Sequence, residues 1–369
     1  MTPFHWLPEH VAAIRPDAAA APVIPRAGRV DVLPGWDVWD HWPLLMRDGA
    51  CAIVAGGKLI FALAAPRGDD PDLRHAAARL WLFHATDAGW RALGPAFGDQ
   101  EMPGSRQWSG SAVLEAGGIV RLFFTAAGER GEAVPGMMQR LFETRAPLRI
   151  EAGVPVLDAW RPATECVRPD GIHYQRELAG GGAIGTIKAF RDPFFLNIAG
   201  SDWLLFAASD ATTRSPWNGA IGAARGTGDG WALAPPLVTA AGLNNELERP
   251  HAILHGDAVY LFWSTQAHIF AEGGPRGPTG LYGVIADRWG GPWRPLNGTG
   301  LVFANPDAAP LQAYSFQVLA DLSVWSFADM PGVRAIPADP AARRAAFAGG
   351  PAPVLRLKLD GATAGLAPP

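Results

Sequence analysis

The sequence predicts an all-β chain of 369 residues, built as a single-domain five-bladed β-propeller with a central funnel-shaped site. Three observations lead to this prediction: short strand-like segments run through the chain, long amphipathic helices are scarce, and similar hairpin turns recur. We expect one domain over residues 1–369, with residues 1–30 forming a helix and an extended segment that pack on it.

The strand-like segments are short, rich in β-branched and aromatic residues, and bounded by Gly or Pro, which are strand signals. They are Lys58–Leu63, Arg79–Phe83, Ile119–Thr125, Trp203–Ala207, Ala258–Trp263, Leu281–Ile285, Leu322–Phe327 and Val354–Leu359. Only Pro8–Ile14 and Pro340–Phe347 have a pattern that favours a helix. The chain is therefore expected to be β throughout.

Five hairpin-like units share one pattern, in which a tight polar or Gly turn joins a strand to an aromatic-rich strand. Their turns are Ala55–Gly57, Ala116–Gly118, Ala199–Asp202, His255–Asp257 and Ala320–Asp321. The successive spacings of about 61, 83, 56 and 64 residues each suit one four-stranded blade with its connections. A β-sandwich would have turns every ~8–12 residues, so the spacing favours a propeller.

The composition excludes several classes of protein. Charged residues make up only 18%, the net charge is −4 and no basic run occurs, so a nucleic-acid partner has no electrostatic footprint. No stretch reaches the ~18 apolar residues of a membrane helix, and the Ala-rich segment Asp17–Ile24 is a poor secretory signal. Cys51 and Cys166 are too few for a disulfide framework, and whether they pair stays open.

Polar and aromatic residues gather in five clusters, each some 6 to 17 residues ahead of one of the turns. The clusters are Val38–Pro43, Gln107–Ser111, Phe190–Pro193, Glu246–His251 and Gln312–Ser315. In a propeller they would begin the inner strands of five blades, so carboxylates far apart in sequence would converge at one mouth. Two carboxylates about 5 Å apart are what a retaining glycosidase needs.

Each cluster also has a purely structural interpretation. Asp40 could be a turn residue bonded to its own backbone, and Arg191 with Asp192 could be a structural ion pair. Glu246 and Glu248, at period-2 spacing, could form a solvated strand edge. The apolar run that follows argues for burial instead, and two buried like charges raise one pKa, as a general acid requires.

Taken together, the five clusters resemble the motifs of glycoside hydrolase family 68, which contains levansucrases, inulosucrases and β-fructofuranosidases. The similarity runs from about Trp36 to Phe327 and includes Pro236–Ala240, Gly280–Gly283 and Pro295–Val302. The pattern most resembles levansucrases of Gram-negative bacteria. It implies a five-bladed propeller that transfers β-fructosyl units from sucrose, through a covalent fructosyl-enzyme, to water and to sugar acceptors such as fructose, glucose, fructooligosaccharides or fructans.

By this resemblance Asp40 matches the nucleophile, Asp192 the transition-state stabiliser and Glu248 the general acid/base. The positions that match substrate-binding residues are Trp39, Trp108, Ser109 and Arg191 around the fructosyl unit, and Glu246, Arg249, Gln266, His268 and Tyr314 around the glucosyl or acceptor side.

Three positions depart from the family pattern. Gln266 stands where many Gram-negative relatives have His, with His268 two residues on, so acceptor choice stays open. The alternatives are a mainly hydrolytic β-fructofuranosidase, a synthase of short fructooligosaccharides and, in another class, a non-catalytic fructan-binding propeller.

Asn245 stands where Gram-positive relatives have a calcium-binding Asp, so no metal and no cofactor are expected. His41 replaces the usual Ser or Thr, and it either tunes the pocket or fills space.

The resemblance also bears on location. An extracellular or periplasmic bacterial enzyme is expected, exported by a leaderless route or from a trimmed precursor, and a cytoplasmic location is the alternative. Linkage type, product length and oligomeric state stay open at the level of sequence.

Overall fold

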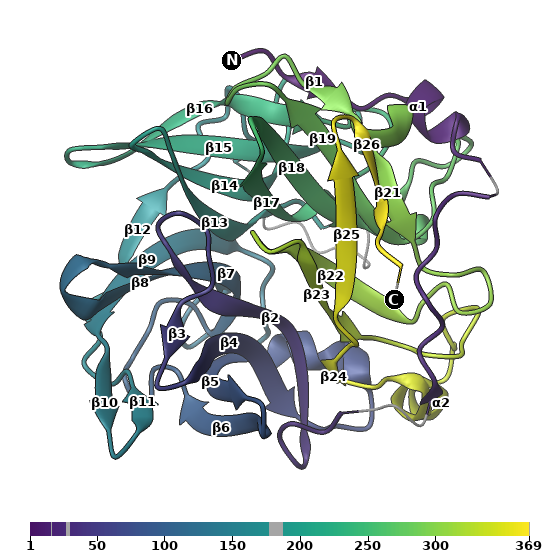
Figure 1. Cartoon of the computed structure of the whole chain (residues 1–369). Helices are drawn as coiled ribbons and strands as arrows, with labels where there is room; N and C mark the ends of the chain where they lie inside the picture. The colour runs from purple at the N-terminus through teal and green to yellow at the C-terminus, as the bar shows by residue number, and fades with distance from the viewer. Residues whose placement is uncertain (16, 27–29, 177–186, 369) are drawn as a thin grey trace.

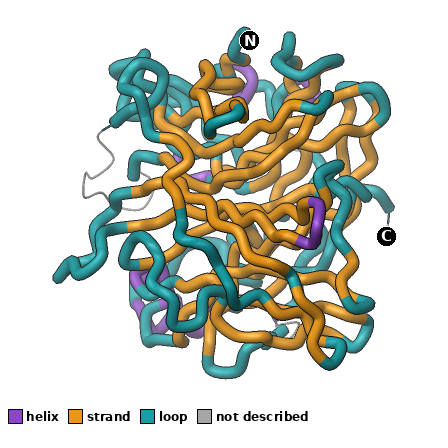
Figure 2. The backbone as a smooth tube through the Cα atoms, turned by 90° about the vertical axis from the view of Figure 1, so that its left-hand side faces the viewer, coloured by secondary structure: helices purple, strands orange, loops and turns teal. Residues whose placement is uncertain are grey.

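Strands dominate the computed structural model, which describes residues 1–15, 17–26, 30–176 and 187–368 (Figures 1 and 2). In this part of the chain the α-helices are the short Pro8–Ala12 (α1) and Pro340–Ala346 (α2), close to the two predicted helices. Each predicted strand segment corresponds to a strand of the structure, and most of the predicted ends differ from the observed ends by a few residues. The expectation of an all-β chain is confirmed.

The strands form five successive antiparallel units, which we number I to V. Unit I comprises β2 (Trp36–Met46), β3 (Ile53–Val54), β4 (Gly57–Pro66), β5 (Arg79–Thr86) and β6 (Gly89–Pro95). Unit II comprises β7 (Arg106–Glu115), β8 (Ile119–Ala127), β9 (Gln139–Pro147) and β12 (Thr164–Val167). The hairpin of β10 (Arg149–Glu151) and β11 (Val154–Val156) lies between β9 and β12 in the chain. Unit III comprises β13 (Phe190–Ile198), β14 (Ser201–Ser209), β15 (Gly219–Thr227) and β16 (Gly230–Thr239). Units IV and V comprise β17 (Glu248–His255), β18 (Ala258–Thr265), β19 (Gly280–Ala286), β20 (Arg294–Pro295) and β21 (Leu301–Ala304), then β22 (Ala313–Val318), β23 (Ser323–Ala328), β24 (Gly350–Pro351), β25 (Leu355–Asp360) and β26 (Thr363–Leu366).

The five predicted turns all occur where the second long strand of a unit begins. Two of them place an alanine followed by a glycine at positive φ, namely Ala55 (47°) with Gly56 (75°) and Ala199 (50°) with Gly200 (76°). Two successive residues with φ > 0 are what the tight hairpin turns that match strand twist require.

The units follow one another around a common centre. β2 contacts β7, β7 contacts β13, β13 contacts β17, β17 contacts β22, and β23 of unit V returns to β2 of unit I. Between units I and II the contact is a parallel pairing of Leu44–Met46 with Ala112–Leu114, which joins both units into one nine-stranded sheet. The hydrophobic core lies between neighbouring units, for example where Phe123 of unit II stacks on Phe195 of unit III.

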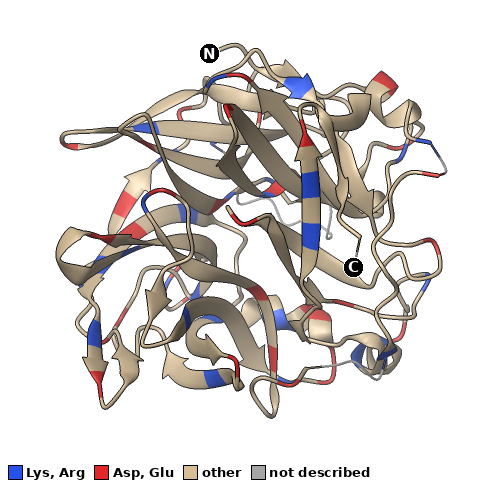
Figure 3. Ribbon diagram, in the orientation of Figure 1, with Lys and Arg blue, Asp and Glu red and all other residues tan. Residues whose placement is uncertain are grey.

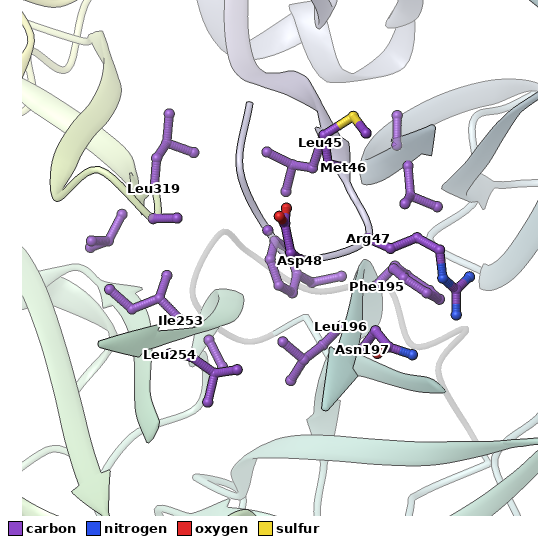
Figure 4. A pocket seen from close by; sticks show the side chains of 17 residues that line it. Leu45, Met46, Arg47, Asp48, Phe195, Leu196, Asn197, Ile253, Leu254 and Leu319 are labelled. Carbon is purple, nitrogen blue, oxygen red and sulfur yellow. The ribbon is translucent and has the colours of Figure 1, made fainter. Parts of the chain in front are cut away.

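One end of this centre is closed by apolar side chains (Figure 4). A cavity of only about 30 Å³ remains there, lined by residues of the first strand of every unit, including Leu45, Val113, Leu196, Ile253 and Val318. The loop after β2, which carries Arg47 and Asp48, covers it. Residues from the opposite ends of the same five strands also line one common space.

The N-terminal segment crosses three units. Phe4–His5 (β1) pairs in parallel with Val238–Thr239 of β16, Ala20 bridges to Ala304 of β21, and the backbone N–H of Ile24 donates to the Gln312 side chain at 2.9 Å. The segment therefore ties units III, IV and V together along their outer side (Figure 1).

Three further features follow from the structure. Cys51 and Cys166 are both free cysteines. Among the described residues, no helix is long and apolar enough to cross a lipid bilayer. Acidic and basic residues are interspersed over the ribbon, without a region of one sign (Figure 3).

Candidate active site

The first strand of every unit contains a β-bulge at the same place. Register shifts occur after Trp39, Trp108, Arg191, Glu248 and Tyr314 in β2, β7, β13, β17 and β22. The next residue has positive φ in four of the five strands: Asp40 (42°), Asp192 (60°), Arg249 (51°) and Ser315 (60°). In a regular strand, successive side chains point to opposite faces, but a bulge re-aims them. Consequently two consecutive side chains per strand reach the same central space.

That space is a pocket of about 510 Å³, at the end of the first strands opposite the closed end. Its volume lies within the range of small-molecule sites, roughly 300–1,000 Å³. All twelve site residues predicted from sequence line it: Trp39, Asp40, Trp108, Ser109, Arg191, Asp192, Glu246, Glu248, Arg249, Gln266, His268 and Tyr314.

Asp40 is oriented by a neighbouring unit. The Ser109 hydroxyl donates to Asp40 Oδ2 at 2.7 Å, and the Ser109 carbonyl accepts from the Thr125 hydroxyl at 3.0 Å. Asp40 therefore does not simply cap its own turn, because its carboxylate bonds across to unit II and faces the pocket.

Asp192 is buried between units II, III and IV. Its backbone N–H donates to the Thr125 hydroxyl at 2.9 Å, and its Oδ2 accepts the backbone N–H of Arg249 at 3.1 Å. Burial raises the pKa of Asp192 to about 6, with the charges of Arg191 and Arg249 opposing and those of Glu248 and Asp40 adding to the shift.

Glu246 and Glu248 share the guanidinium of Arg191, which is buried. Its Nη2 lies 2.6 Å from Glu248 Oε1 and 3.4 Å from Glu246 Oε2, whereas its Nε is 3.9 Å from Asp192 Oδ2. The Tyr314 hydroxyl donates to the other oxygen of Glu248. Arg191 thus pairs mainly with the two glutamates of unit IV, and the solvated strand edge considered from sequence is wrong because Glu246 is buried.

The pKa values of this group are displaced by burial. Burial, followed by the charge of Glu248, raises the pKa of Glu246 to about 8. Burial likewise raises the pKa of Tyr314 well above its ordinary value, so its hydroxyl keeps its proton and donates. Glu246 therefore keeps its proton to a higher pH than an ordinary glutamic acid does.

Two tryptophans form one wall of the pocket. Trp39 and Trp108 both pack edge-on against the His75 ring, with centroids 5.7 and 6.4 Å away, and the Trp108 indole N–H donates to the His75 carbonyl at 3.2 Å. Burial lowers the pKa of His75 well below its ordinary value, so this ring is neutral. The guanidinium of Arg74 lies 5.4 Å from the Trp39 ring centroid.

Gln266 and His268 line the pocket from the turn after β18. His268 lies in a short 3₁₀ helix, Ala267–Ile269, that directly follows Gln266. Burial lowers the pKa of His268, and the charge of Glu248 opposes that shift.

Asn245 is a partner of an ammonium group. Lys188 Nζ donates to the side-chain oxygens of Asn245 at 2.9 Å and Asn218 at 2.7 Å, and also to the Pro216 carbonyl. Among the residues that the structure describes, no group of three His, Cys, Asp or Glu lies together in a way that could hold a metal ion.

His41 lies behind the bulge and does not line the pocket. Its ring packs against Trp90 and Trp325, with centroids 5.2 and 5.6 Å away. Burial and the charge of Arg249 lower its pKa to about 3, so the ring is a neutral, space-filling group.

Several pocket residues were not predicted from the sequence. They are Leu63, Asp72, Arg74, His75, Met137, Ile187, Thr279, Leu311, Ser315, Phe327, Asp329, Met330 and Ile336. Ser315 could have been found, because it follows Tyr314 as Asp40 follows Trp39 at the equivalent bulge. Arg74 and His75 lie in the 3₁₀ helix Pro71–Ala76 (η2), outside all five clusters, and carried no signal.

An all-β chain that gathers tryptophans, an arginine and buried carboxylates in one large pocket defines a class of protein, the enzymes that act on carbohydrates. Within that class, the chain belongs to glycoside hydrolase family 68, the Levansucrase/Invertase family, whose model matches residues 10–226 and 215–366. The resemblance seen in the sequence motifs is confirmed.

Relatives and solved structures agree with this assignment. The levansucrase of Rahnella aquatilis is 30% identical over 338 residues, covering 79% of this chain and 78% of that protein. An extracellular sucrase of Zymomonas mobilis is 30% identical over 361 residues, covering 88% of this chain and 83% of that protein. The inulosucrase of Halalkalicoccus jeotgali, solved with kestose bound, is 36% identical with a TM-score of 0.90, covering 99% of this chain and 95% of that one.

Proposed function

We propose that this enzyme takes the β-fructosyl unit of sucrose, holds it as a covalent fructosyl-enzyme, and passes it to sugar acceptors and to water. The observation that carries the proposal is that Asp40, Asp192 and Glu248 enter one pocket from units I, III and IV, beside Trp39. Family membership and the names of the relatives, a levansucrase, a sucrase and an inulosucrase, support the same substrate chemistry.

Asp40 acts as the nucleophile on the anomeric carbon of the fructosyl unit. One oxygen of the Asp40 carboxylate accepts a hydrogen bond from Ser109, which leaves the other oxygen free to form the ester bond. A covalent intermediate divides one difficult substitution into two easier ones, and the two inversions give overall retention.

Glu248 acts as general acid on the leaving glucose oxygen and then as general base on the incoming acceptor. The raised pKa of Glu246 supports this role, because the pair of glutamates then binds a proton more tightly than an ordinary glutamic acid does. Arg191 and Tyr314 hold both oxygens of Glu248, so its direction changes little between the two steps.

Asp192 stabilises the transition state without bonding covalently to the sugar. Positive charge develops on the fructosyl ring as the glycosidic bond breaks, and a buried, fixed carboxylate interacts more strongly with that charge than water would. In its ionised form Asp192 supplies that charge.

The remaining predicted residues bind the sugars. Trp39, Trp108, Ser109 and Arg191 surround the fructosyl unit, and Glu246, Arg249, Gln266, His268 and Tyr314 surround the glucosyl or acceptor side. The effect of the Glu248 charge on the pKa of His268 supports the place of His268 on the acceptor side.

We also propose that the five units are the blades of a single-domain five-bladed propeller with the funnel-shaped pocket on its axis. The contacts between consecutive first strands, and the return of β23 to β2, support this architecture. An extracellular or periplasmic place of action is supported by the relative that is named an extracellular sucrase.

Incubation with sucrose tests the function. Glucose released in excess of fructose indicates transfer, whereas equal release would indicate hydrolysis alone. We expect Asp40→Ala, Asp192→Ala and Glu248→Ala each to lower glucose release by at least ~100-fold, since acid–base groups alone contribute about 10²–10⁴-fold.

Circular dichroism should show the wild-type fold in all three variants, and the exposed Asp307→Ala serves as the matched control. A fructosyl adduct trapped on the wild type and detected by mass spectrometry should be absent from Asp40→Ala. Near-native glucose release by one of these variants would show that the substituted residue does not have the proposed role.

A further inference from the structure

Asp329 is a pocket carboxylate that the proposed mechanism does not use. It directly follows β23, two residues after Phe327, and both residues line the pocket. Its backbone is fixed on both sides, because its N–H donates to the Gln312 carbonyl at 2.9 Å and its own carbonyl accepts from Ala348 at 2.7 Å. The direction of the side chain into the pocket is therefore set by the fold.

The other pocket carboxylates all have a protein partner. Asp40 accepts from Ser109, Asp192 from the Arg249 backbone, Glu246 and Glu248 face Arg191, and Asp72 lies 3.1 Å from Arg343 Nε. Across the described part of the chain, the Asp329 carboxylate has no hydrogen bond and no ion pair within 4.0 Å. A carboxylate taken from water without a partner is costly, so its oxygens are available to ligand hydroxyls.

Backbone and ring contacts place Asp329 toward one side of the pocket. Its carbonyl accepts from Ala348, which follows Phe347, and the Arg74 guanidinium lies 4.5 Å from the Phe347 ring and 5.4 Å from the ring of Trp39, the neighbour of Asp40. Burial raises the pKa of Asp329 to about 6; the charge of Arg74 opposes the shift, and those of Asp72 and Asp40 add to it. Asp329 thus lies on the side of Asp40.

Arg74 keeps this side of the pocket polar and ordered. Its guanidinium lies over the Phe347 ring at 4.5 Å and over the Trp39 ring at 5.4 Å, and its Nη1 donates to the Pro71 carbonyl at 2.8 Å. The cation is therefore fixed on the side of the pocket that Asp40 and Asp329 share, where its charge favours an ionised carboxylate that accepts hydrogen bonds.

We propose that Asp329 is a specificity-determining residue that accepts hydrogen bonds from hydroxyl groups of the fructosyl unit while Asp40 engages its anomeric carbon. This inference rests on the proposed function, since it assigns one more contact within the same site. A carboxylate that accepts hydrogen bonds from the hydroxyl groups of one sugar of sucrose, but not from the other sugar, discriminates between the two halves of sucrose.

The test is product inhibition of glucose release in Asp329→Asn, which keeps the size of the side chain and removes its charge. We expect the inhibition constant for fructose and the KM for sucrose to rise by roughly 10- to 100-fold, the range for a hydrogen bond to a charged group. The inhibition constant for glucose should change less than about twofold, and kcat should fall less than KM rises. Asp307→Asn, an exposed carboxylate elsewhere in the chain, should change none of these constants.

A rise in the inhibition constant for glucose instead of fructose would overturn the inference, as would unchanged constants for both sugars. If Asp329 only supported the packing of Arg74, thermal stability would fall with no selectivity between the sugars, which also overturns it. The wild type is assayed in parallel: absence of glucose release by the wild type would count against the proposed function, whereas an active wild type with an indifferent Asp329→Asn counts against this inference alone.

Discussion

The residues that enter the pocket do so at a local conformational cost. Asp40, Asp192, Arg249 and Ser315 all have φ between 42° and 60°, a region that costs non-glycine residues of order 1–3 kcal/mol each. A regular strand would avoid this cost, but it would turn every second side chain away from the pocket. The strain is thus the physical consequence of placing two neighbouring side chains per strand on the same side.

Unpaired polar atoms add to that cost. Trp39 Nε1, Arg249 Nη1 and Ser315 Oγ are buried without a hydrogen-bond partner among the described residues, and all three side chains line the pocket. A buried polar atom without a partner costs roughly 1–3 kcal/mol. Such a site is organised for a polyhydroxylated ligand before that ligand arrives, at the expense of stability.

The pH dependence of kcat/KM for glucose release is expected to be bell-shaped. Asp192 has to be ionised to face the positive fructosyl ring, and since its pKa is raised to about 6, the rate should rise as pH increases through about 6. The Glu246–Glu248 pair has to keep one proton, and since the pKa of Glu246 is raised to about 8, the rate should fall as pH increases through about 8.

Glu246→Gln separates the two limbs. The remaining carboxyl loses the like-charged neighbour that keeps the proton on the pair, so the alkaline limb should move to lower pH while the acid limb stays near 6. Initial rates across acid and alkaline buffers measure both limbs. An alkaline limb that stays near 8 in Glu246→Gln would show that Glu246 does not set it.

Among the elements, the short helix α2 connects unit V to unit I. Arg344 forms a bidentate pair with Asp37 of β2, with Nη1–Oδ2 at 2.5 Å and Nη2–Oδ1 at 3.0 Å, and Asp37 is only 1% exposed. Arg343 pairs with Asp70 and Asp72 at the start of η2, the 3₁₀ helix that carries Arg74 and His75 into the pocket. Through these pairs the helix holds η2, and with it one wall of the pocket, in position.

Arg344→Ala should lower the free energy of unfolding by about 3 kcal/mol, because it leaves the buried Asp37 carboxylate short of its main partner. The loss is at the lower end of the range for buried pairs, since Arg67 Nε remains 3.5 Å from Asp37. Urea denaturation measures it. In the control Arg294→Ala, which breaks an exposed pair with Asp287, the loss should be less than about 1 kcal/mol, and an equal loss in both variants would contradict the argument.

At the scale of the whole molecule, the N-terminal segment holds units III and IV together. Trp6 is fully buried, its backbone N–H donates to Thr239 of β16 at 2.8 Å, and its indole N–H donates to Thr299 at 3.0 Å. Its ring contacts Trp263 and Tyr282 of unit IV with centroids 5.4 and 5.0 Å away. A single side chain therefore joins the terminus to two units.

Trp6→Ala should lower the free energy of unfolding by about 3–5 kcal/mol, the usual cost of removing a fully buried tryptophan. Because Trp6 does not line the pocket, kcat and KM for sucrose should stay close to wild type below the melting temperature. The neighbouring Leu7→Ala, at a residue 37% exposed, is the control and should cost less than about 0.5 kcal/mol. Similar melting temperatures for the two variants would show that the segment contributes little.

The resemblance of the five clusters to family motifs identified the twelve pocket residues, from Trp39 to Tyr314, and the sequence by itself determined the strands, the hairpin turns and the clusters. These depend on local chemistry: β-branched runs, Gly at positive φ, and carboxylates beside aromatic residues, all legible within about ten positions. Only the tertiary structure decided that Arg191 pairs with Glu246 and Glu248, that Lys188 holds Asn245, and that Arg74, His75 and Asp329 complete the pocket. Such contacts join residues of different units, and they depend on how the units surround a common centre, which no local pattern encodes.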